Sequence, residues 1–329
     1  MRNRTILVAS CVLAALLAPA ALAGGQKVTL TLDWTPNPDH VGFYDAQSTG
    51  LFAKAGLDVT IRAPSDPTAT LKLVAVGQSD LAVSYEQEIF FAAARKLPVV
   101  AVAAVVPQPL NSIIAIDARI RSVRDLKGRT VGITGVPSDY AALDTALASA
   151  GLTRKDVHIV SVGYNLLPAL LAHKVDAVIG VYRNVEGIQL KERGLAPTII
   201  PLDRAGIPSY DELVLVANAQ RLHDDAAYRS TVRRFVGAFL AGTADARQHP
   251  QRALAILKKV TASGAGFLAR ATPATLALLA GRDGIGCMRS AEWQRFGDWM
   301  HARGLLKNPI PAATVMSTSF LPRRCPTGG

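Results

Sequence analysis

The sequence contains few cysteines, few aromatic residues and no dense run of basic residues. Three cysteines in 329 residues are too few for a small domain held together by disulfides. Aromatic residues make up 6 % of the chain, and its 36 lysines and arginines are spread along it. Proteins that read nucleic acids usually cluster basic residues with stacking aromatics. We therefore interpret the net charge of +11 as a general surface bias and expect no nucleic-acid partner.

Several motifs of common enzyme classes are also missing. The chain has no Gly-x-Ser-x-Gly nucleophile elbow, no His-Glu-x-x-His zinc motif and no Gly-x-Gly-x-x-Gly loop after a predicted strand. Its six histidines are scattered, and no Cys/His cluster has the spacing of a metal site. We therefore expect no catalytic residue, no cofactor and no bound metal.

One long apolar run is present, at the N-terminus. Arg2 and Arg4 precede an apolar stretch that starts at Ile6, and Ala-Leu-Ala at 21–23 is a cleavage site of the small-residue kind. We interpret residues 1–23 as a signal peptide. No later stretch approaches the roughly 18 to 20 apolar residues of a membrane span, so we expect an exported protein without a transmembrane helix.

Two points about the cysteines stay open. Val8-Ala9-Ser10-Cys11 resembles a lipoprotein cleavage box, which would anchor the protein to a lipid. The apolar run before Cys11 is short and continues past it, which favours the later cleavage site. After cleavage only Cys287 and Cys325 remain, and in an oxidising compartment they either form one disulfide or stay two free thiols.

Predicted strands and helices alternate along most of the chain. Asn37 is a good N-cap and Pro38 suits a first helical turn, so one helix is expected to run on to residue 55, where Gly56 ends it. The same alternation starts again near residue 123. The predicted strands are 27–34, 57–62, 80–84, 99–106, 130–133, 158–162, 176–181, 198–202 and 213–217. The predicted helices are 37–55, 68–76, 86–96, 138–150, 166–172, 184–193, 228–248, 252–260 and 273–280. This pattern predicts an α/β protein with two units, each a mostly parallel sheet flanked by helices.

The two units share a weak internal repeat. Residues 71–83 and 167–179 both read as a helix, a short turn, and a strand that begins with an aspartate, Asp80 or Asp176. Any two β-α-β units look alike to this degree. The repeat therefore favours two similar units without establishing them.

Polar and aromatic residues gather at the predicted carboxyl ends of the strands, where open α/β sheets bind ligands. Aromatic faces stack on flat rings, carboxylates accept hydrogen bonds from amino groups, and amides do both. The candidate ligand-binding residues are Trp34, Asn37, His40, Tyr85, Glu86, Ser138, Asp139, Tyr164, Tyr182, Asn184 and Glu186. As a set they suit a nitrogen-rich ring and fit a phosphate poorly, although a helix that starts at Ser138 suits an anion. Each residue alone is also compatible with a core or capping role.

The segment from Leu32 to Tyr44, Leu-Asp-Trp-Thr-Pro-Asn-Pro-Asp-His-Val-Gly-Phe-Tyr, resembles the opening motif of proteins that bind pyrimidine precursors of thiamine. Further similar segments are 50–52, 56–59, 64–67, 77–82, 132–133, 137–139 and 182–187. The resemblance covers about residues 27–222. The same family includes the eukaryotic thiamine pyrimidine synthases.

The resemblance implies the type II periplasmic binding protein fold, a two-lobed Venus flytrap with the ligand in its cleft. The expected function is that of a monomeric, periplasmic substrate-binding protein of an ABC importer. Such a protein carries a formylaminopyrimidine-like compound to a permease and its ATPase. The expected lobes are 26–108 with 208–329, and 109–207. The positions that the resemblance favours as ligand contacts are Trp34, Asn37, His40, Tyr85, Tyr182 and Glu186.

Two departures from the family pattern keep other ligands open. Pro38-Asp39 and Arg183 stand where the pyrimidine binders have other residues. A different heterocycle such as riboflavin, or an aromatic acid or sulfonate held by Arg183, is therefore an alternative. A synthase-like enzyme fits less well, because Ser84 and Glu88 stand where that branch has its pyridoxal-phosphate lysine and its histidine.

Overall fold

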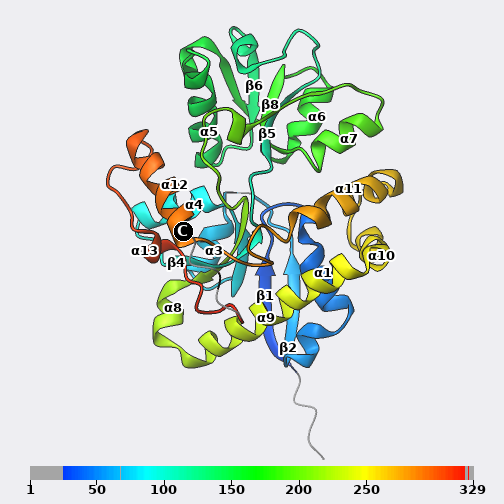
Figure 1. The fold of residues 1–329 in the computed structure, drawn as a ribbon, viewed down its shortest axis with the longest axis vertical. Helices are drawn as coiled ribbons and strands as arrows, with labels where there is room; N and C mark the ends of the chain where they lie inside the picture. The colour runs from blue at the N-terminus through cyan, green and yellow to red at the C-terminus, as the bar shows by residue number, and fades with distance from the viewer. Residues whose placement is uncertain (1–24, 67, 323–324, 326–329) are drawn as a thin grey trace, which may run out of the picture.

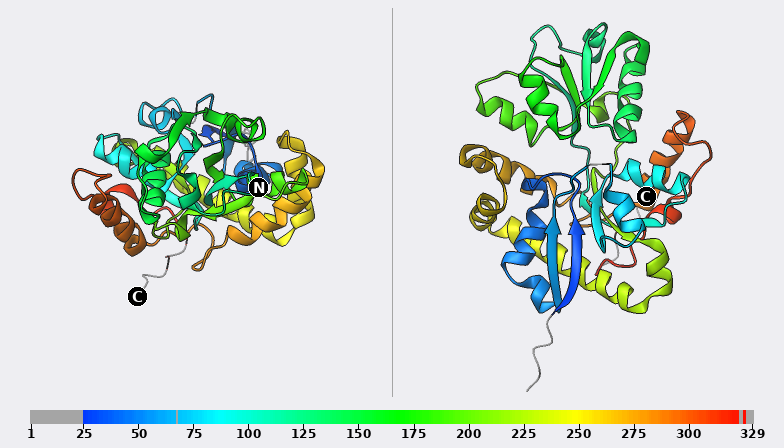
Figure 2. Two further views of the ribbon diagram at one scale, coloured as in Figure 1. Left: turned by 90° about the horizontal axis from the view of Figure 1, so that it is seen from above. Right: turned by 180° about the vertical axis from the view of Figure 1, so that it is seen from behind.

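The chain folds into two lobes, each built on a mixed β-sheet flanked by helices (Figures 1 and 2). The computed structural model describes residues 25–66, 68–322 and 325, so the predicted signal peptide and Cys11 lie outside the described residues. The strands are β1 (Gln26–Thr31), β2 (Leu57–Arg62), β3 (Leu81–Ser84), β4 (Val99–Val106), β5 (Asn111–Ala115), β6 (Thr130–Ile133), β7 (His158–Ser161), β8 (Ala177–Tyr182), β9 (Thr198–Pro201) and β10 (Leu213–Asn218). This arrangement confirms the predicted two-lobed α/β fold.

The two sheets have the same architecture. Within the described residues, one sheet has the order β2-β1-β3-β10-β4 and the other has the order β7-β6-β8-β5-β9. In the first sheet β10 runs antiparallel to both of its neighbours, and in the second sheet β5 does the same. The other pairings, β1 with β2 and β3, and β6 with β7 and β8, are parallel. Both sheets therefore direct the carboxyl ends of most strands toward the gap between the lobes.

Helices cover both faces of each sheet (Figure 1). The α-helices are α1 (Val41–Ser48), α2 (Leu51–Lys54), α3 (Thr70–Ala75), α4 (Glu86–Ala94), α5 (Pro137–Ser149), α6 (Leu166–Leu171), α7 (Glu186–Glu192), α8 (Ala219–Asp224), α9 (Ala226–Gln248), α10 (Pro250–Val260), α11 (Ala265–Leu278), α12 (Ser290–Ala302) and α13 (Ala312–Val315). The 3-10 helices are η1 (Pro38–His40), η2 (Val123–Leu126), η3 (Arg154–Asp156), η4 (Gly163–Asn165) and η5 (Leu202–Arg204). Because helices lie on both sides, strand β10 and its neighbour at the sheet edge, β4, are buried along their whole length.

The chain crosses between the lobes twice. It leaves the first sheet at Val106, the end of β4, and enters the second at Asn111, the start of β5. It leaves the second sheet at Pro201 and returns to the first at Leu213. The predicted lobe boundaries, 108/109 and 207/208, fall in these two crossings and stay a prediction.

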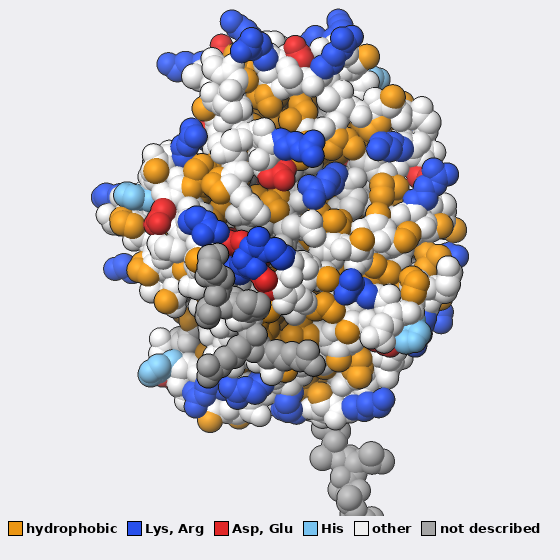
Figure 3. All heavy atoms as spheres, viewed as in Figure 1, with side chains coloured by type: hydrophobic (Ala, Val, Ile, Leu, Met, Phe, Trp, Pro, Cys, Tyr) orange, Lys and Arg blue, Asp and Glu red, His pale blue; other side chains and the backbone are white. Residues whose placement is uncertain are grey.

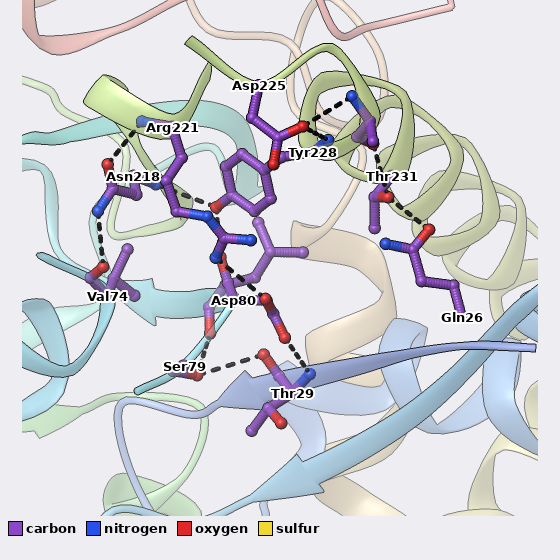
Figure 4. A network of polar contacts seen from close by, with 12 residues as sticks. Gln26, Thr29, Val74, Ser79, Asp80, Asn218, Arg221, Asp225, Tyr228 and Thr231 are labelled. Atoms are coloured by element: carbon purple, nitrogen blue, oxygen red, sulfur yellow. Dashed lines mark hydrogen bonds and ion pairs between the residues drawn. The ribbon is translucent and has the colours of Figure 1, made fainter. Parts of the chain in front are cut away.

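The aspartates of the sequence repeat have the same structural role in both lobes. The Asp80 carboxylate accepts a hydrogen bond from the Thr29 backbone N–H at 3.0 Å, and the Asp176 carboxylate accepts one from Thr130 at 2.8 Å. Each aspartate thereby fixes its strand against the neighbouring parallel strand. Asp80 also accepts from Arg221, which lies over a tyrosine ring of α9 at 3.9 Å (Figure 4). This network ties β1 and β3 to the helices beneath them.

Helices α1 and α9 cross at a point where only glycine fits. A Cβ atom on Gly242 of α9 would lie 2.5 Å from the Gly42 carbonyl oxygen and 2.7 Å from the Ala46 side chain. The backbones of the two helices therefore approach directly. The phenylalanine rings Phe43 and Phe239 stack beside the crossing with centroids 4.2 Å apart. This crossing holds the site-bearing N-terminal segment against the longest helix of the lobe.

Two predicted helices differ in the structure, and one strand of the structure was not predicted. The helix predicted over 37–55 is split into η1, α1 and α2, because the chain turns at Gly50, whose φ of +73° suits glycine. Strand β5 was not predicted, since it is buried on both faces and so lacks the alternation of a half-buried strand. Helix α11 begins at Ala265 and contains Pro273, the residue that the sequence indicated as its start.

The C-terminal segment is tied to the first lobe. Cys287 and Cys325 form a disulfide with their Cα atoms 5.5 Å apart, which settles the question that the sequence left open.

Lys and Arg side chains are spread over the face shown in Figure 3 and form no single basic patch there. Within the described part of the chain, every helix is too short or too polar to cross a membrane.

The glycine at the α1–α9 crossing gives a test of the packing. We expect Gly242→Ala to lower the free energy of unfolding by about 1–3 kcal/mol, because the new methyl group forces the helices apart. Gly237→Ala in the same helix is the matched control, since its Cβ would meet nothing within 4 Å. It should leave the protein as stable or raise its stability by about 0.5–1 kcal/mol. Equal melting temperatures for the two variants would contradict the close crossing.

Candidate functional site

Most of the predicted site residues lie along a cleft between the two lobes. The strand ends of β1 and β3 face those of β6 and β8 across this cleft. Its larger cavity, about 240 Å³, is lined from one lobe by residues including Asp33 and Tyr85 and from the other by Gly135 and Val136. A smaller hollow beside it is lined by Tyr85, Ser138, Asp139, Tyr182 and Glu212, among others. Both lobes therefore contribute to one binding region.

A buried aspartate organises the first lobe's side of the cleft. The Asp33 carboxylate accepts from His40 Nε2 at 2.8 Å and from the Tyr85 hydroxyl at 3.2 Å. His40 Nδ1 in turn accepts the Asn37 backbone N–H at 3.2 Å, so the ring hydrogen lies on Nε2, facing Asp33. Asp33 is only 2 % exposed. It therefore fixes the positions of two predicted site residues.

Asn37 has a capping role in the structure. Its side-chain oxygen accepts the backbone N–H of Asp39 at 2.8 Å, and with His40 it forms a capping box at the start of η1. The N-cap function that the sequence indicated for Asn37 is thus present, on a 3-10 turn. This turn places Asp39 at the cleft.

Two contacts join the lobes on the side of the cleft near α7. The Asn184 side-chain amide donates to Asp39 at 2.7 Å and to the Thr275 hydroxyl at 2.9 Å. The Trp34 and Tyr164 rings meet edge to face, with centroids 4.2 Å apart. Each contact pairs a residue of the second lobe with one from the first. The cleft in this structure is therefore closed.

The second lobe adds a tyrosine and an acid at the end of β8. The Glu186 carboxylate accepts the Tyr182 backbone N–H at 2.7 Å. Burial raises the pKa of Glu186 to about 7, and the negative charges of Asp39 and Asp33 add to this effect. The pKa of Tyr182 is raised well above its usual value, again chiefly by burial. Glu186 therefore takes up a proton near neutral pH.

Several buried polar atoms in the cleft lack partners within the described residues. They are the Tyr182 hydroxyl, one Asp39 carboxylate oxygen and the Asn184 side-chain oxygen. Buried polar groups are normally hydrogen-bonded, because desolvation without a partner is costly. Of the three, the Tyr182 hydroxyl belongs to a residue that lines the smaller hollow, so it is the position where a ligand has a hydrogen bond to gain.

Ser138 and Asp139 begin helix α5. Asp139 accepts the Thr134 backbone N–H at 2.7 Å and so shapes the turn before the helix, while its burial raises its pKa to about 7. The Ser138 backbone N–H donates to the Glu88 carboxylate of the other lobe at 2.8 Å. The anion position that the sequence suggested at this helix start is thus filled by a side chain of the protein.

Glu86 lies apart from the other predicted residues. Its carboxylate accepts the Asp211 backbone N–H at 2.7 Å, and the Asp211 carboxylate accepts from the Trp293 indole at 2.7 Å. Burial raises the pKa of Glu86 well above its usual range, with the Asp211 charge adding to the effect. The structure therefore places Glu86 against the second crossing and helix α12.

Sequence reasoning missed three residues of the cleft as site candidates. Asp33 belongs to the opening motif but is absent from the predicted contacts. Glu88 lies two residues beyond Glu86, the last residue predicted as a contact at the end of β3. Glu212, just before β10, accepts the backbone N–H groups of Leu110 and Asn111 at 2.5 and 2.7 Å. It lies on the return crossing, where the sequence shows no strand end, so no local signal marks it. In the described chain no group of His, Cys, Asp and Glu side chains is arranged to hold a metal.

The two sheets, their crossings and the cleft at the strand ends define a two-lobed ligand-binding fold. The same fold is seen in the alkanesulfonate-binding protein SsuA from Xanthomonas axonopodis bound to MOPS, with a TM-score of 0.71 and 18 % identity over 90 % of this chain and 99 % of that one. Residues 37–253 match the model of the "NMT1/THI5 like" family, and the chain belongs to that family. This confirms the resemblance seen in the sequence.

Relatives within the family include binding proteins and enzymes. A formylaminopyrimidine-binding protein from Halalkalibacterium halodurans is 32 % identical over 301 residues, which are 89 % of this chain and 90 % of that protein. A 4-amino-5-hydroxymethyl-2-methylpyrimidine phosphate synthase from Uromyces fabae is 29 % identical over 169 residues, or 51 % of this chain and 49 % of the synthase. The similarity to the binding protein thus extends over much more of the chain.

The buried acid Asp39 gives the cleft a pH dependence that can be measured. Burial raises its pKa from 3.8 to about 6, against the opposing effects of the neighbouring His40 and of the hydrogen bond from Asn184. The folded state therefore binds the proton more tightly, and the stabilisation from this group is full below pH 4 and is lost as the pH rises through 6.

We expect Asp39→Asn to remove this pH-dependent loss of stability. The variant keeps the side-chain oxygen that accepts a hydrogen bond from Asn184. Thermal unfolding of both proteins from pH 4 to pH 8 is the measurement. The melting temperature of the variant should rise relative to that of the wild type as the pH increases from 4 to 7. A constant difference over the whole range would show that Asp39 does not titrate as described.

Proposed function

We propose that the protein is an exported substrate-binding protein that captures a thiamine-related pyrimidine of the formylaminopyrimidine kind and delivers it to an ABC permease with its ATPase. The observation that carries this proposal is the similarity to the formylaminopyrimidine-binding protein over nearly the whole length of both chains. The signal-peptide pattern at 1–23 supports a periplasmic location. The closed two-lobed form would be the one that docks on the permease.

The chemistry of the cleft supports an aminopyrimidine. Such a ring is flat, carries an amino donor, and has ring nitrogens that accept hydrogen bonds. The aromatic side chains Trp34, Tyr85 and Tyr182 supply apolar faces from both lobes. A carboxyl group that holds a proton near neutral pH, as Glu186 does, both donates and accepts, and therefore complements an amino group beside a ring nitrogen.

The residues favour binding over catalysis. Ser84, where the synthase branch has its lysine, is buried and 4 % exposed. Glu88, where that branch has its histidine, is engaged by the Ser138 backbone N–H. A synthase-like reaction would therefore lack both groups. We propose that the protein is not an enzyme.

Closure follows from contacts that a ligand makes with both lobes. A ligand shifts the equilibrium between open and closed forms by its difference in affinity for the two. The cavity is lined by Asp33 and Tyr85 from one lobe and by Gly135 and Val136 from the other, and the Tyr182 hydroxyl has no partner among the described residues. A pyrimidine that contacts both sets would bind the closed form much more tightly than the open one.

A thermal-shift screen of the mature, ligand-free protein tests the proposal. The panel holds formylaminopyrimidine, hydroxymethylpyrimidine, thiamine, riboflavin, and aromatic sulfonates and carboxylates. A ligand at one hundred times its Kd adds about 2.7 kcal/mol, which raises the melting temperature by several degrees. We expect the shift with the pyrimidines. A shift with riboflavin or the acids alone would contradict the proposed ligand.

Tyr182→Phe separates a ligand contact from a structural role. The hydroxyl has no partner within residues 25–66 and 68–322, so its removal should leave the unliganded melting temperature unchanged or slightly higher. The affinity for the pyrimidine, measured by calorimetry, should fall roughly 3- to 10-fold through one lost hydrogen bond. Tyr140→Phe, on the same lobe but outside the two cavities of the cleft, is the control. Equal affinities for the two variants would remove Tyr182 from the site.

A further inference from the structure

A carboxylate of one lobe binds the start of a helix in the other. Glu88 lies in the first turn of α4, and its Oε1 accepts the Ser138 backbone N–H at 2.8 Å. Ser138 is the second residue of the thirteen-residue helix α5, whose first residue, Pro137, has no N–H to offer. The Glu88 side chain is nine-tenths buried, with 9 % of its surface exposed. The contact is thus an internal part of the closed cleft.

The position that Glu88 occupies is one that an anion would otherwise take. The free N–H groups and the dipole at a helix N-terminus attract carboxylates, sulfonates and phosphates. The next N–H, that of Asp139, already donates to the Val136 carbonyl at 3.1 Å. Ser138 is therefore the donor that faces the other lobe. An anionic ligand group at this point would have to displace the protein's own carboxylate.

The surrounding cavity has the features of a ligand compartment. Glu88 and Pro137 both line the cavity of about 240 Å³, together with Thr70 and Arg95. The Thr70 hydroxyl is buried and has no hydrogen-bond partner among the residues that the structure describes. Arg95 places a positive charge near Glu88. Without Glu88, the cavity would offer a helix start, a hydroxyl and a cation to an anion.

We propose that Glu88 is a specificity-determining residue that acts as a built-in anion. It excludes sulfonates, sulfate and other small anions from the cleft and helps to hold the lobes closed around an uncharged heterocycle. The exclusion of anions rests on the Glu88–Ser138 contact. The closure around a heterocycle rests in addition on the proposed binding function.

Glu88→Ala in the mature protein tests the exclusion of anions. The probes are sulfate and methanesulfonate, titrated by calorimetry and thermal shift. We expect the variant to bind both anions at least 10-fold more tightly than the wild type does, a change of about 1.4 kcal/mol. Asp58→Ala, which removes an exposed negative charge from β2, controls for net charge and should show no gain. A gain equal to that of the control would overturn the proposal.

Chemical rescue tests the second part. Glu88→Ala should bind the pyrimidine more weakly, and acetate or formate should restore most of that affinity by occupying the vacated position. Glu88→Gln keeps an oxygen that accepts from Ser138, so its affinity should stay within about 3-fold of the wild type. Absence of rescue would contradict the built-in anion. If Glu88→Ala does not fold, Glu88→Ser vacates the same space and receives the same tests.

The two proposals fail in different ways. A wild type that binds no pyrimidine would refute the proposed function, while the sulfate titration would still report on Glu88. A wild type that binds the pyrimidine, with a variant that gains no anion affinity, would refute the role of Glu88 alone.

Discussion

The geometry of the cleft depends on one buried carboxylate at the crossings between the lobes. Glu212, on the return crossing, accepts the backbone N–H groups of Leu110 and Asn111 on the outward crossing, and the Tyr210 hydroxyl at 3.1 Å. It is 1 % exposed. Because one oxygen joins both crossings, the two sheets keep their strand ends facing each other. The contacts between the lobes across the cleft can form only while the strand ends of the two sheets face each other.

The same constraint explains why the cleft is rich in acids with raised pKa values. Closing the lobes removes water from carboxyl groups on both sides, and desolvation disfavours their charged forms. Glu212 and Glu186 both have a pKa raised to about 7 by burial. Some of these groups are satisfied by the backbone, while atoms of Asp39, Tyr182 and Asn184 are left without partners among the described residues. A ligand with hydrogen-bond donors and acceptors along one edge relieves that cost.

Much of the fold could be predicted from the sequence because its signals are local. Strands β2, β4 and β6 have the predicted bounds, because β2 alternates apolar and polar residues while β4 and β6 are short, mainly apolar runs. The break at Gly50 was missed because a glycine inside a helical pattern does not by itself show a left-handed turn. Strand β5 was missed because its partner strands are distant in sequence, and burial on both faces removes the alternating pattern.

The candidate site was predictable only in part, for a related reason. Strand ends are visible in a sequence, and this led to Tyr85, Tyr182 and Asn184. The partner that each side chain selects is not visible. Glu86 pairs with Asp211 at the hinge, whereas Glu88, two residues further along the same helix, reaches the opposite lobe. About half a turn of the helix separates the two directions, and only the packed structure decides between them.

The central claim is that one small heterocycle is held between the two lobes at the strand ends. A crystal structure of the mature protein with formylaminopyrimidine tests it most directly. The account predicts the ring in the closed cleft, in contact with aromatic side chains of both lobes and within hydrogen-bond distance of Tyr182 or Glu186. A ring bound to one lobe only, or outside the cleft, would contradict it.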